Sequence, residues 1–157
     1  MISGRIATGA IAALALPGLG LGLGLAGSAG AATTHSPRYV VLDCGLKPQT
    51  KPGTIVLTCA DAGIGLQGLH WTSWTSELAS GYGTEWENDC KPYCAAGHIH
   101  HYPVLAMLWG SASVQGHPAE RRYTRVTLVY PGARPPLYTT VNGKVVATYP
   151  VSQTLPV

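Results

Sequence analysis

The sequence predicts an α+β fold that is mainly β, with an antiparallel sheet of about six or seven strands, one or two short helices and two disulfides. Short runs of β-branched and aromatic residues recur along most of the chain. Between them lie turns supplied by the 20 glycines and 12 prolines. Because the chain lacks the strand–helix alternation that builds a parallel sheet, we expect antiparallel pairing.

The N-terminal segment has the pattern of a secretory signal peptide. Arg5 is the one charged residue of residues 1–32, and a long run of alanine, glycine and leucine follows it. Small residues at Ala29 and Ala31 fit a cleavage site, which we place after Ala31. Pro17 and the lack of charge beyond the run argue against a permanent membrane anchor. We therefore predict a signal peptide over residues 1–31 and a single secreted β-rich domain over residues 32–157.

The charge and apolar patterning of the secreted part exclude two classes of partner. Charged residues make up 11% of the chain, and the net charge is only +3. This balance predicts no strong attraction to nucleic acid. No later apolar stretch is long enough to cross a bilayer, so we expect no stable membrane insertion after cleavage.

All four cysteines, Cys44, Cys59, Cys90 and Cys94, lie in the exported part. An even number of cysteines outside the cytoplasm indicates disulfides, here two. Four cysteines can pair in more than one way. We favour Cys44–Cys59 and Cys90–Cys94, because each bond closes a short local loop.

The first predicted element is a hairpin. Residues 38–43 and 54–59 are strand-like, and the second of these runs is strongly β-branched. Residues 47–53 form the turn, by their proline and glycine content. This hairpin would bring Cys44 opposite Cys59.

The next elements are a strand, a short helix and a long loop. Alternation over residues 68–74 predicts a half-buried strand. Residues 75–80 predict a helical segment, with Thr75 as N-cap and Gly81 as its stop. Residues 81–97 carry glycines, a proline and two cysteines, and we expect a long loop stapled by a disulfide.

The third part of the chain supplies two longer strands. Residues 102–109 form an apolar run of strand length, which predicts a central strand covered on both faces. Residues 110–120 are expected to be a loop, and residues 121–130 a long strand.

The strongest local signal is the C-terminal hairpin. Two strand-like runs, residues 137–141 and 144–149, flank Asn142-Gly143. A type I′ turn requires positive φ at both central residues, which asparagine and glycine tolerate. The predicted register places Thr140 opposite Val145 and Tyr138 opposite Ala147.

A histidine cluster raises the alternative of a zinc or copper site. His98 and His100 would point to one face of an extended segment, with His101 beside them. The spacing matches no closed zinc motif, and two disulfides would leave no thiolate ligands. We therefore expect no metal and no cofactor, and keep extracellular zinc or copper binding as an alternative.

The sequence predicts that the protein is not an enzyme. It contains neither the Gly-x-Ser-x-Gly nor the His-Glu-x-x-His motif. The segment from Cys90 to Cys94 is one residue too long for a Cys-x-x-Cys redox motif. Glu85 and Glu87 could share one strand face, but two exposed acids on a loop are the simpler interpretation.

Aromatic residues indicate a binding surface. The chain has 4 tryptophans and 8 tyrosines but no phenylalanine, which suggests carbohydrate stacking or a protein contact. Trp71 and Trp109 are expected in the core. The candidate binding residues in the stapled loop are Trp86, Lys91, Pro92, Tyr93 and His98.

Most of the mature chain resembles a set of small secreted actinobacterial proteins of uncharacterised function. The likeness rests on Asp-Cys-Gly at residues 43–45, PGTIVLTCAD at residues 52–61, Trp71-x-x-Trp74 and NDCKPYCAAG at residues 88–97. It implies secretion and carries no activity.

A second resemblance is to the subtilisin-inhibitor family of secreted bacterial proteins. Residues 56–60 (VLTCA) resemble its strand and first cysteine, and residues 77–83 its helix and glycine exit. The likeness implies that an exposed, disulfide-pinned loop enters a protease cleft, with Pro92, Tyr93 and Cys94 in the scissile region. This chain has no cysteine near Trp74 or at the C-terminus, where that family's partner cysteines would fall.

We therefore predict a secreted, non-catalytic binding protein of the extracellular space or cell envelope, which contacts its partner through residues 87–101. One alternative is a subtilisin-inhibitor-like protein whose partner is an extracellular serine protease. The other is the zinc- or copper-binding protein.

Overall fold

A computed structural model describes residues 36–157 of the chain. The predicted signal peptide, residues 1–31, lies outside the described residues. Over residues 36–157 the chain forms twelve strands and a single turn of 3-10 helix. The prediction of a mainly β fold with two disulfides is confirmed. The prediction of one or two short helices is wrong, because the 3-10 turn is the only helical element of the described residues. No helix in this part of the chain is long and apolar enough to cross a membrane.

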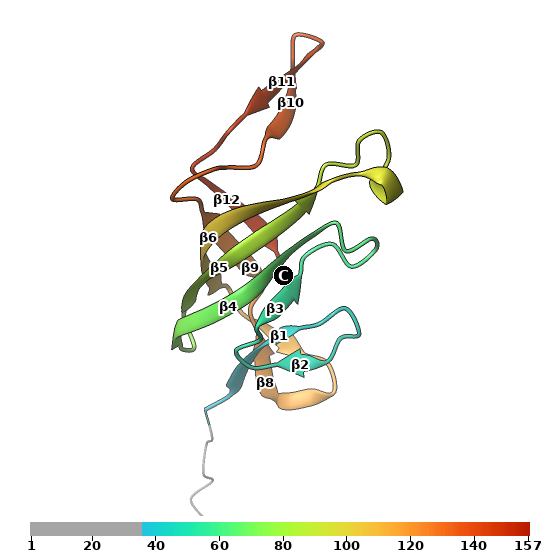
Figure 1. The fold of residues 1–157 in the computed structure, drawn as a ribbon. Coiled ribbons are helices and arrows are strands. Elements are labelled where there is room, and N and C mark those ends of the chain that lie inside the picture. Colours follow the sequence, from blue (N-terminus) through green and yellow to red (C-terminus); the bar gives the residue numbers. More distant parts are fainter. Residues whose placement is uncertain (1–35) are drawn as a thin grey trace, which may run out of the picture. The chain divides into compact units, whose positions relative to one another are not determined.

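The main sheet has six strands, all paired antiparallel, in the order β12-β9-β6-β5-β4-β3 (Figure 1). Its strands are β3 (Thr54–Val56), β4 (Ile64–Trp74), β5 (Ala79–Asn88), β6 (Ile99–Trp109), β9 (Arg125–Val129) and β12 (Ser152–Pro156). The long strands β5 and β6 lie at its centre and pair without a register shift.

A smaller sheet has the order β2-β1-β8-β7. Its strands are β1 (Arg38–Leu42), β2 (Pro48–Gln49), β7 (Ala112–Val114) and β8 (His117–Arg122). β1 and β8 pair in parallel, in contrast to the antiparallel pairing of the main sheet.

The C-terminal hairpin, β10 (Leu137–Val141) and β11 (Lys144–Thr148), forms a two-stranded sheet of its own. Asn142 has φ 49° and Gly143 has φ 75°, the positive values that a type I′ turn requires. The observed register pairs Thr140 with Val145 and Tyr138 with Ala147, as the sequence predicts.

The hydrophobic core lies on one face of the main sheet. Along β6, Val104, Ala106 and Leu108 are buried, whereas Leu105 is 49% and Trp109 42% exposed. This two-residue period is that of a strand with one face in the core and one in solvent. The prediction that β6 is covered on both faces is therefore wrong, and so is the core assignment of Trp109.

The inner face of the main sheet is concave. The amide of Gln153 in β12 donates a hydrogen bond of 3.2 Å to Oε1 of Glu85 in β5. Two strands, β9 and β6, lie between these residues in the sheet. Adjacent strands are about 4.8 Å apart, so a flat sheet would hold the two side chains too far apart for this contact.

The first predicted hairpin is wrong, although its disulfide forms. β1 pairs with β2 and β8, and β3 pairs with β4. The predicted turn over residues 47–53 contains β2, whose Gln49 pairs with Val41 and so occupies an edge of β1. Cys44 and Cys59 nevertheless form a disulfide, with 5.5 Å between their Cα atoms.

The helix predicted over residues 75–80 is a tight turn between β4 and β5. The Thr75 hydroxyl oxygen accepts hydrogen bonds from the backbone N–H groups of Glu77 and Leu78. The same side-chain chemistry caps helices and closes turns. Because Trp74 already pairs with Ala79, the intervening residues are too few for a helix.

Residues 81–97 were predicted as a loop, but the first half belongs to β5. Gly81 and Gly83 are strand residues that face the neighbouring backbone: a Cβ at Gly81 would lie 2.5 Å from the carbonyl oxygen of His70. The boundaries further along the chain also differ. The predicted loop over residues 110–120 contains β7 and part of β8, and the predicted strand over residues 121–130 is split between β8 and β9.

Candidate functional site

Two side chains, one at the end of β5 and one directly after it, hold the connection between β5 and β6 in place. We call residues 89–98 the stapled loop, because the Cys90–Cys94 disulfide closes it. Asn88 donates from Nδ2 to the carbonyl oxygen of Cys94 at 2.8 Å, and its Oδ1 accepts from the N–H of Cys90 at 2.9 Å. A single 3-10 turn, η1 (Cys94–Ala96), completes the loop. The disulfide and Asn88 together fix its backbone.

Asp89 organises the same loop from its other side. Its Oδ1 accepts hydrogen bonds from the backbone N–H groups of His98 and Lys91. Its Oδ2 lies 3.3 Å from Nε2 of His100. The hydrogen bond from the His98 N–H, followed by that from Lys91, holds the pKa of Asp89 well below its usual range. This carboxylate is therefore negatively charged, and its hydrogen bonds hold the backbone of the loop.

A cavity of about 370 Å³ lies between the stapled loop and the C-terminal hairpin. The ends of β5 and β6, the loop and the hairpin line it with Glu87, Asn88, Asp89, Lys91, His100, Tyr102, Pro136 and Tyr138. Lys91 Nζ donates a hydrogen bond of 3.2 Å to the Tyr138 hydroxyl and lies 5.3 Å from the centre of its ring. We call this cavity the loop–hairpin pocket.

Two acidic residues of β5 lie near this pocket, on the same face of the strand. Glu85 and Glu87 share the inner face of the strand, opposite Tyr102 and His100 of β6. Burial raises the pKa of Glu87, and the nearby His100 opposes that rise. Of these two acids, Glu87 lines the pocket.

Glu85 is completely buried below the pocket. Burial raises its pKa to about 7, and hydrogen bonds with Tyr130 and Gln153 oppose the rise. Its Oε2 has no hydrogen-bond partner among the described residues. Burial and the adjacent Glu85 carboxyl raise the pKa of Tyr130 in turn. Glu85, Tyr130 and Gln153 thus form a polar layer over the apolar core.

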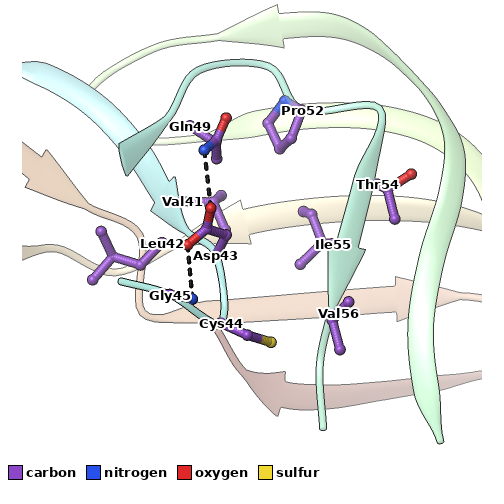
Figure 2. A pocket seen from close by; sticks show the side chains of 10 residues that line it. All are labelled: Val41, Leu42, Asp43, Cys44, Gly45, Gln49, Pro52, Thr54, Ile55 and Val56. Atoms are coloured by element: carbon purple, nitrogen blue, oxygen red, sulfur yellow. Dashed lines mark hydrogen bonds between the residues drawn. The ribbon is translucent and has the colours of Figure 1, made fainter. Parts of the chain in front are cut away.

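A second cavity, of about 330 Å³, is lined by residues 41–45, Gln49, Pro52 and residues 54–56 (Figure 2). Cys44 in this lining forms the disulfide with Cys59. Asp43 is the one charged residue among those that line it. Its carboxylate accepts from the N–H groups of Gly45 and Lys47 and from the Gln49 amide. The Lys47 hydrogen bond is the largest cause of its lowered pKa. The oxygens of Asp43 therefore hold the turn together.

The structure places most of the predicted binding residues on the stapled loop. Lys91, Pro92, Tyr93 and His98 lie there and are exposed, with Tyr93 at 63%. Trp86 does not: it belongs to β5, and its indole N–H donates to the carbonyl oxygen of Ala62 at 2.9 Å. Its ring covers Gly65 on the neighbouring strand, so Trp86 has a packing role.

The three histidines of the predicted cluster do not all lie together. His98 and His100 both approach Asp89 Oδ2, at 3.6 and 3.3 Å. His101 lies on the other face of β6, where its ring nitrogen is 3.4 Å from the Gln67 amide. Within residues 36–157, no three histidine, cysteine, aspartate or glutamate side chains are close enough to hold a metal ion.

Sequence reasoning missed the pocket itself. The alternation of Glu85, Glu87 and Asp89 is a strand signal that could have extended β5 and placed these acids on one face. The contribution of Tyr138 leaves no local trace, because it meets Lys91 from 47 residues further along the chain.

No family model matches the chain, and no curated protein or solved structure is significantly similar to it. The two family resemblances therefore stay predictions.

Proposed function

We propose that this chain is a secreted, non-catalytic protein that binds a component of the cell envelope through the stapled loop and the C-terminal hairpin. The observation that carries the proposal is the exposure of the hairpin beside a rigid loop. All ten strand residues of β10 and β11 are exposed. The hairpin joins the stapled loop through the Lys91–Tyr138 hydrogen bond.

The hairpin has the composition of a contact surface. Lys144 is its one charged residue, and its exposed apolar residues include Val141, Val145 and Val146. An isolated two-stranded hairpin is marginally stable in water. Apolar side chains exposed in such a group favour a role in binding. A partner that covers them would stabilise the hairpin.

The stapled loop supplies the rigid part of the same surface. A disulfide, Asn88 and Asp89 fix its backbone, and Tyr93 projects from it. A segment held in one conformation loses little entropy on binding. Exposed tyrosines combine an apolar ring with a hydroxyl, and they are common at contact sites.

The two disulfides favour an oxidising environment outside the cytoplasm. All four cysteines of the chain take part in them. Disulfides persist in secreted proteins and are rare where thiols are kept reduced. Together with the signal pattern of residues 1–31, they support secretion.

Cosedimentation with the envelope fraction of the producing organism tests this function. We expect saturable retention of the secreted protein. A variant with both Tyr93→Ser and Tyr138→Ser should lose it, whereas the control Tyr82→Ser should keep it. Tyr82 is 51% exposed, on the opposite face of β5 from the pocket. Complete partition of the wild-type protein to the supernatant would overturn the proposal.

Inhibition of a serine protease is the second candidate. Tyr93 is exposed and its backbone is extended, with φ −153° and ψ 160°, as a substrate-like residue requires. We rank this function second because η1 turns the chain directly after Tyr93. Stoichiometric loss of subtilisin or trypsin activity, with slow cleavage within residues 89–97, would establish it. Full protease activity at a molar excess of the protein would exclude it for these enzymes.

A further inference from the structure

The loop–hairpin pocket offers both hydrogen-bond donors and acceptors. Lys91 Nζ is a donor, the Glu87 carboxylate is an acceptor, and the hydroxyls of Tyr102 and Tyr138 can act as either. Both residues line the pocket, and no hydrogen bond from the described residues reaches the Glu87 carboxylate or the Tyr102 hydroxyl. Burial is the main cause of the raised pKa of each group. These two groups therefore have free hydrogen-bonding capacity that a ligand can use.

Charges of opposite sign lie side by side around the pocket. Backbone N–H groups hold Asp89 as a carboxylate. Lys91 is an ammonium, and its hydrogen bond to Tyr138 is the main cause that raises its pKa further. An anion entering the pocket would meet Glu87 and Asp89, and a cation would meet Lys91. Each would be repelled by one of the two signs. An uncharged polar molecule escapes both repulsions and can still use the donors and acceptors that the loop leaves free.

Aromatic rings bound the pocket on two elements. Tyr102 comes from β6 and Tyr138 from β10. The Tyr102 ring packs edge-on against Tyr130, at 6.5 Å between ring centres and 85° between planes, which fixes its orientation. Rings of this kind provide apolar surface next to a polar group. A volume of about 370 Å³ suits a small ligand.

We propose that the loop–hairpin pocket binds a neutral carbohydrate. The Glu87 carboxylate accepts hydrogen bonds from sugar hydroxyls, Lys91 donates to them, and the rings of Tyr102 and Tyr138 pack against the C–H surface of the sugar. A sugar is the class of ligand in which each hydroxyl both donates and accepts while the ring carries no charge. This inference rests on the proposed function and specifies the envelope component as a glycan.

Calorimetric titration of the secreted protein tests the assignment. The probes are glucose, galactose, mannose, N-acetylglucosamine, maltose, cellobiose and chitobiose, with inorganic phosphate as an anion and spermidine as a cation. We expect saturable binding of at least one neutral sugar and of neither ion. Glu87→Gln should weaken that binding at least about tenfold, because hydrogen bonds to a charged acceptor are worth more than neutral ones. The matched control Glu77→Gln, at an exposed site in the β4–β5 turn, should bind like the wild type.

Tyr138→Ala is a second variant in a separate element, and circular dichroism of each variant verifies folding. The assignment is overturned if no neutral sugar binds at up to about 10 mM. It is equally overturned if a sugar binds and both pocket variants leave the affinity unchanged. Envelope retention that no bound sugar competes with removes the glycan and leaves the proposed function standing. Sugar binding without envelope retention removes the proposed function and leaves the pocket assignment standing.

Discussion

Lys91 in the stapled loop donates a hydrogen bond to the hydroxyl of Tyr138 in β10, at 3.2 Å. This contact joins two segments that both lie outside the hydrophobic core of the main sheet. Both residues line the loop–hairpin pocket, together with Glu87 of β5 and Tyr102 of β6. The pair therefore determines the shape of the candidate site and contributes nothing to the core.

Tyr138→Phe should loosen the hairpin without unfolding the protein. The substitution removes the oxygen that accepts the Lys91 hydrogen bond and keeps the ring. Because neither β10 nor β11 contributes a core residue, the midpoint of global unfolding should stay the same while amide exchange in both strands accelerates. Hydrogen exchange followed by NMR measures both effects. Tyr82→Phe is the control, and equal exchange rates in Tyr138→Phe and wild type would contradict the account.

Glu85→Gln should remove a defined part of the pH dependence of stability. The pKa of Glu85 is about 7 in the folded protein, against 4.5 for a free side chain. Below pH 4.5 both states are protonated. As the pH rises towards 7 the unfolded state ionises first, and stability is lost. The loss amounts to about 3 kcal/mol and levels off above pH 7.

Urea denaturation at a series of pH values measures this effect. Glu87, whose pKa is raised, also lowers the stability as the pH rises. Asp89, whose pKa is lowered, has the opposite effect on the stability. Both remain in Glu85→Gln, so the difference between the two stability curves isolates Glu85. We expect the free energy of unfolding of Glu85→Gln, relative to that of the wild type, to increase from low to neutral pH. Parallel curves would show that Glu85 is not buried as described.

Gly65→Ala should destabilise the main sheet. A Cβ at this position would lie 2.2 Å from the Trp86 ring and 2.7 Å from the backbone oxygen of Ile55. Relief of this overlap requires movement of the indole and of the backbone, at a cost of about 1–3 kcal/mol. Gly53→Ala is the control, because no atom lies within 4 Å of its added Cβ. Chemical denaturation of both variants provides the comparison, and equal stabilities would contradict the packing of Trp86 on Gly65.

Removal of each disulfide should have a different effect on stability and on envelope retention. Cys44–Cys59 spans 15 residues, and replacing both cysteines by serine should cost about 3 kcal/mol. Cys90–Cys94 spans only 4, and its removal should cost less, about 2 kcal/mol. The second change should abolish envelope retention, because it frees the stapled loop. Retention equal to that of the wild type would show that the loop need not be fixed in order to bind.

Local chemistry made some elements predictable from the sequence. Asn142-Gly143 tolerates positive φ at two consecutive positions, which few other pairs do, so the hairpin and its register follow from the sequence. The disulfide pairing follows from short loop lengths. Thr75 shows the limit of such signals, because its side chain caps a turn by the same hydrogen bonds with which it would cap a helix.

Long-range pairing accounts for what the sequence could not predict. Gly81 and Gly83 look like loop residues, but they permit close approach of β5 to the β4 backbone. β1 pairs with β8 through residues some eighty positions apart, such as Arg38 and Glu120. The pocket needs both the extended β5 and the Lys91–Tyr138 contact, and this contact leaves no local pattern in the chain.

Photocrosslinking from single positions tests the central claim most directly. A photoreactive amino acid replaces Tyr93, Tyr138 or, as a control, Tyr82 in the protein, which is then irradiated on the envelope fraction. The account predicts covalent capture of envelope material from positions 93 and 138 and none from position 82. Capture from position 82 alone would place the contact on the opposite face of the sheet and contradict it.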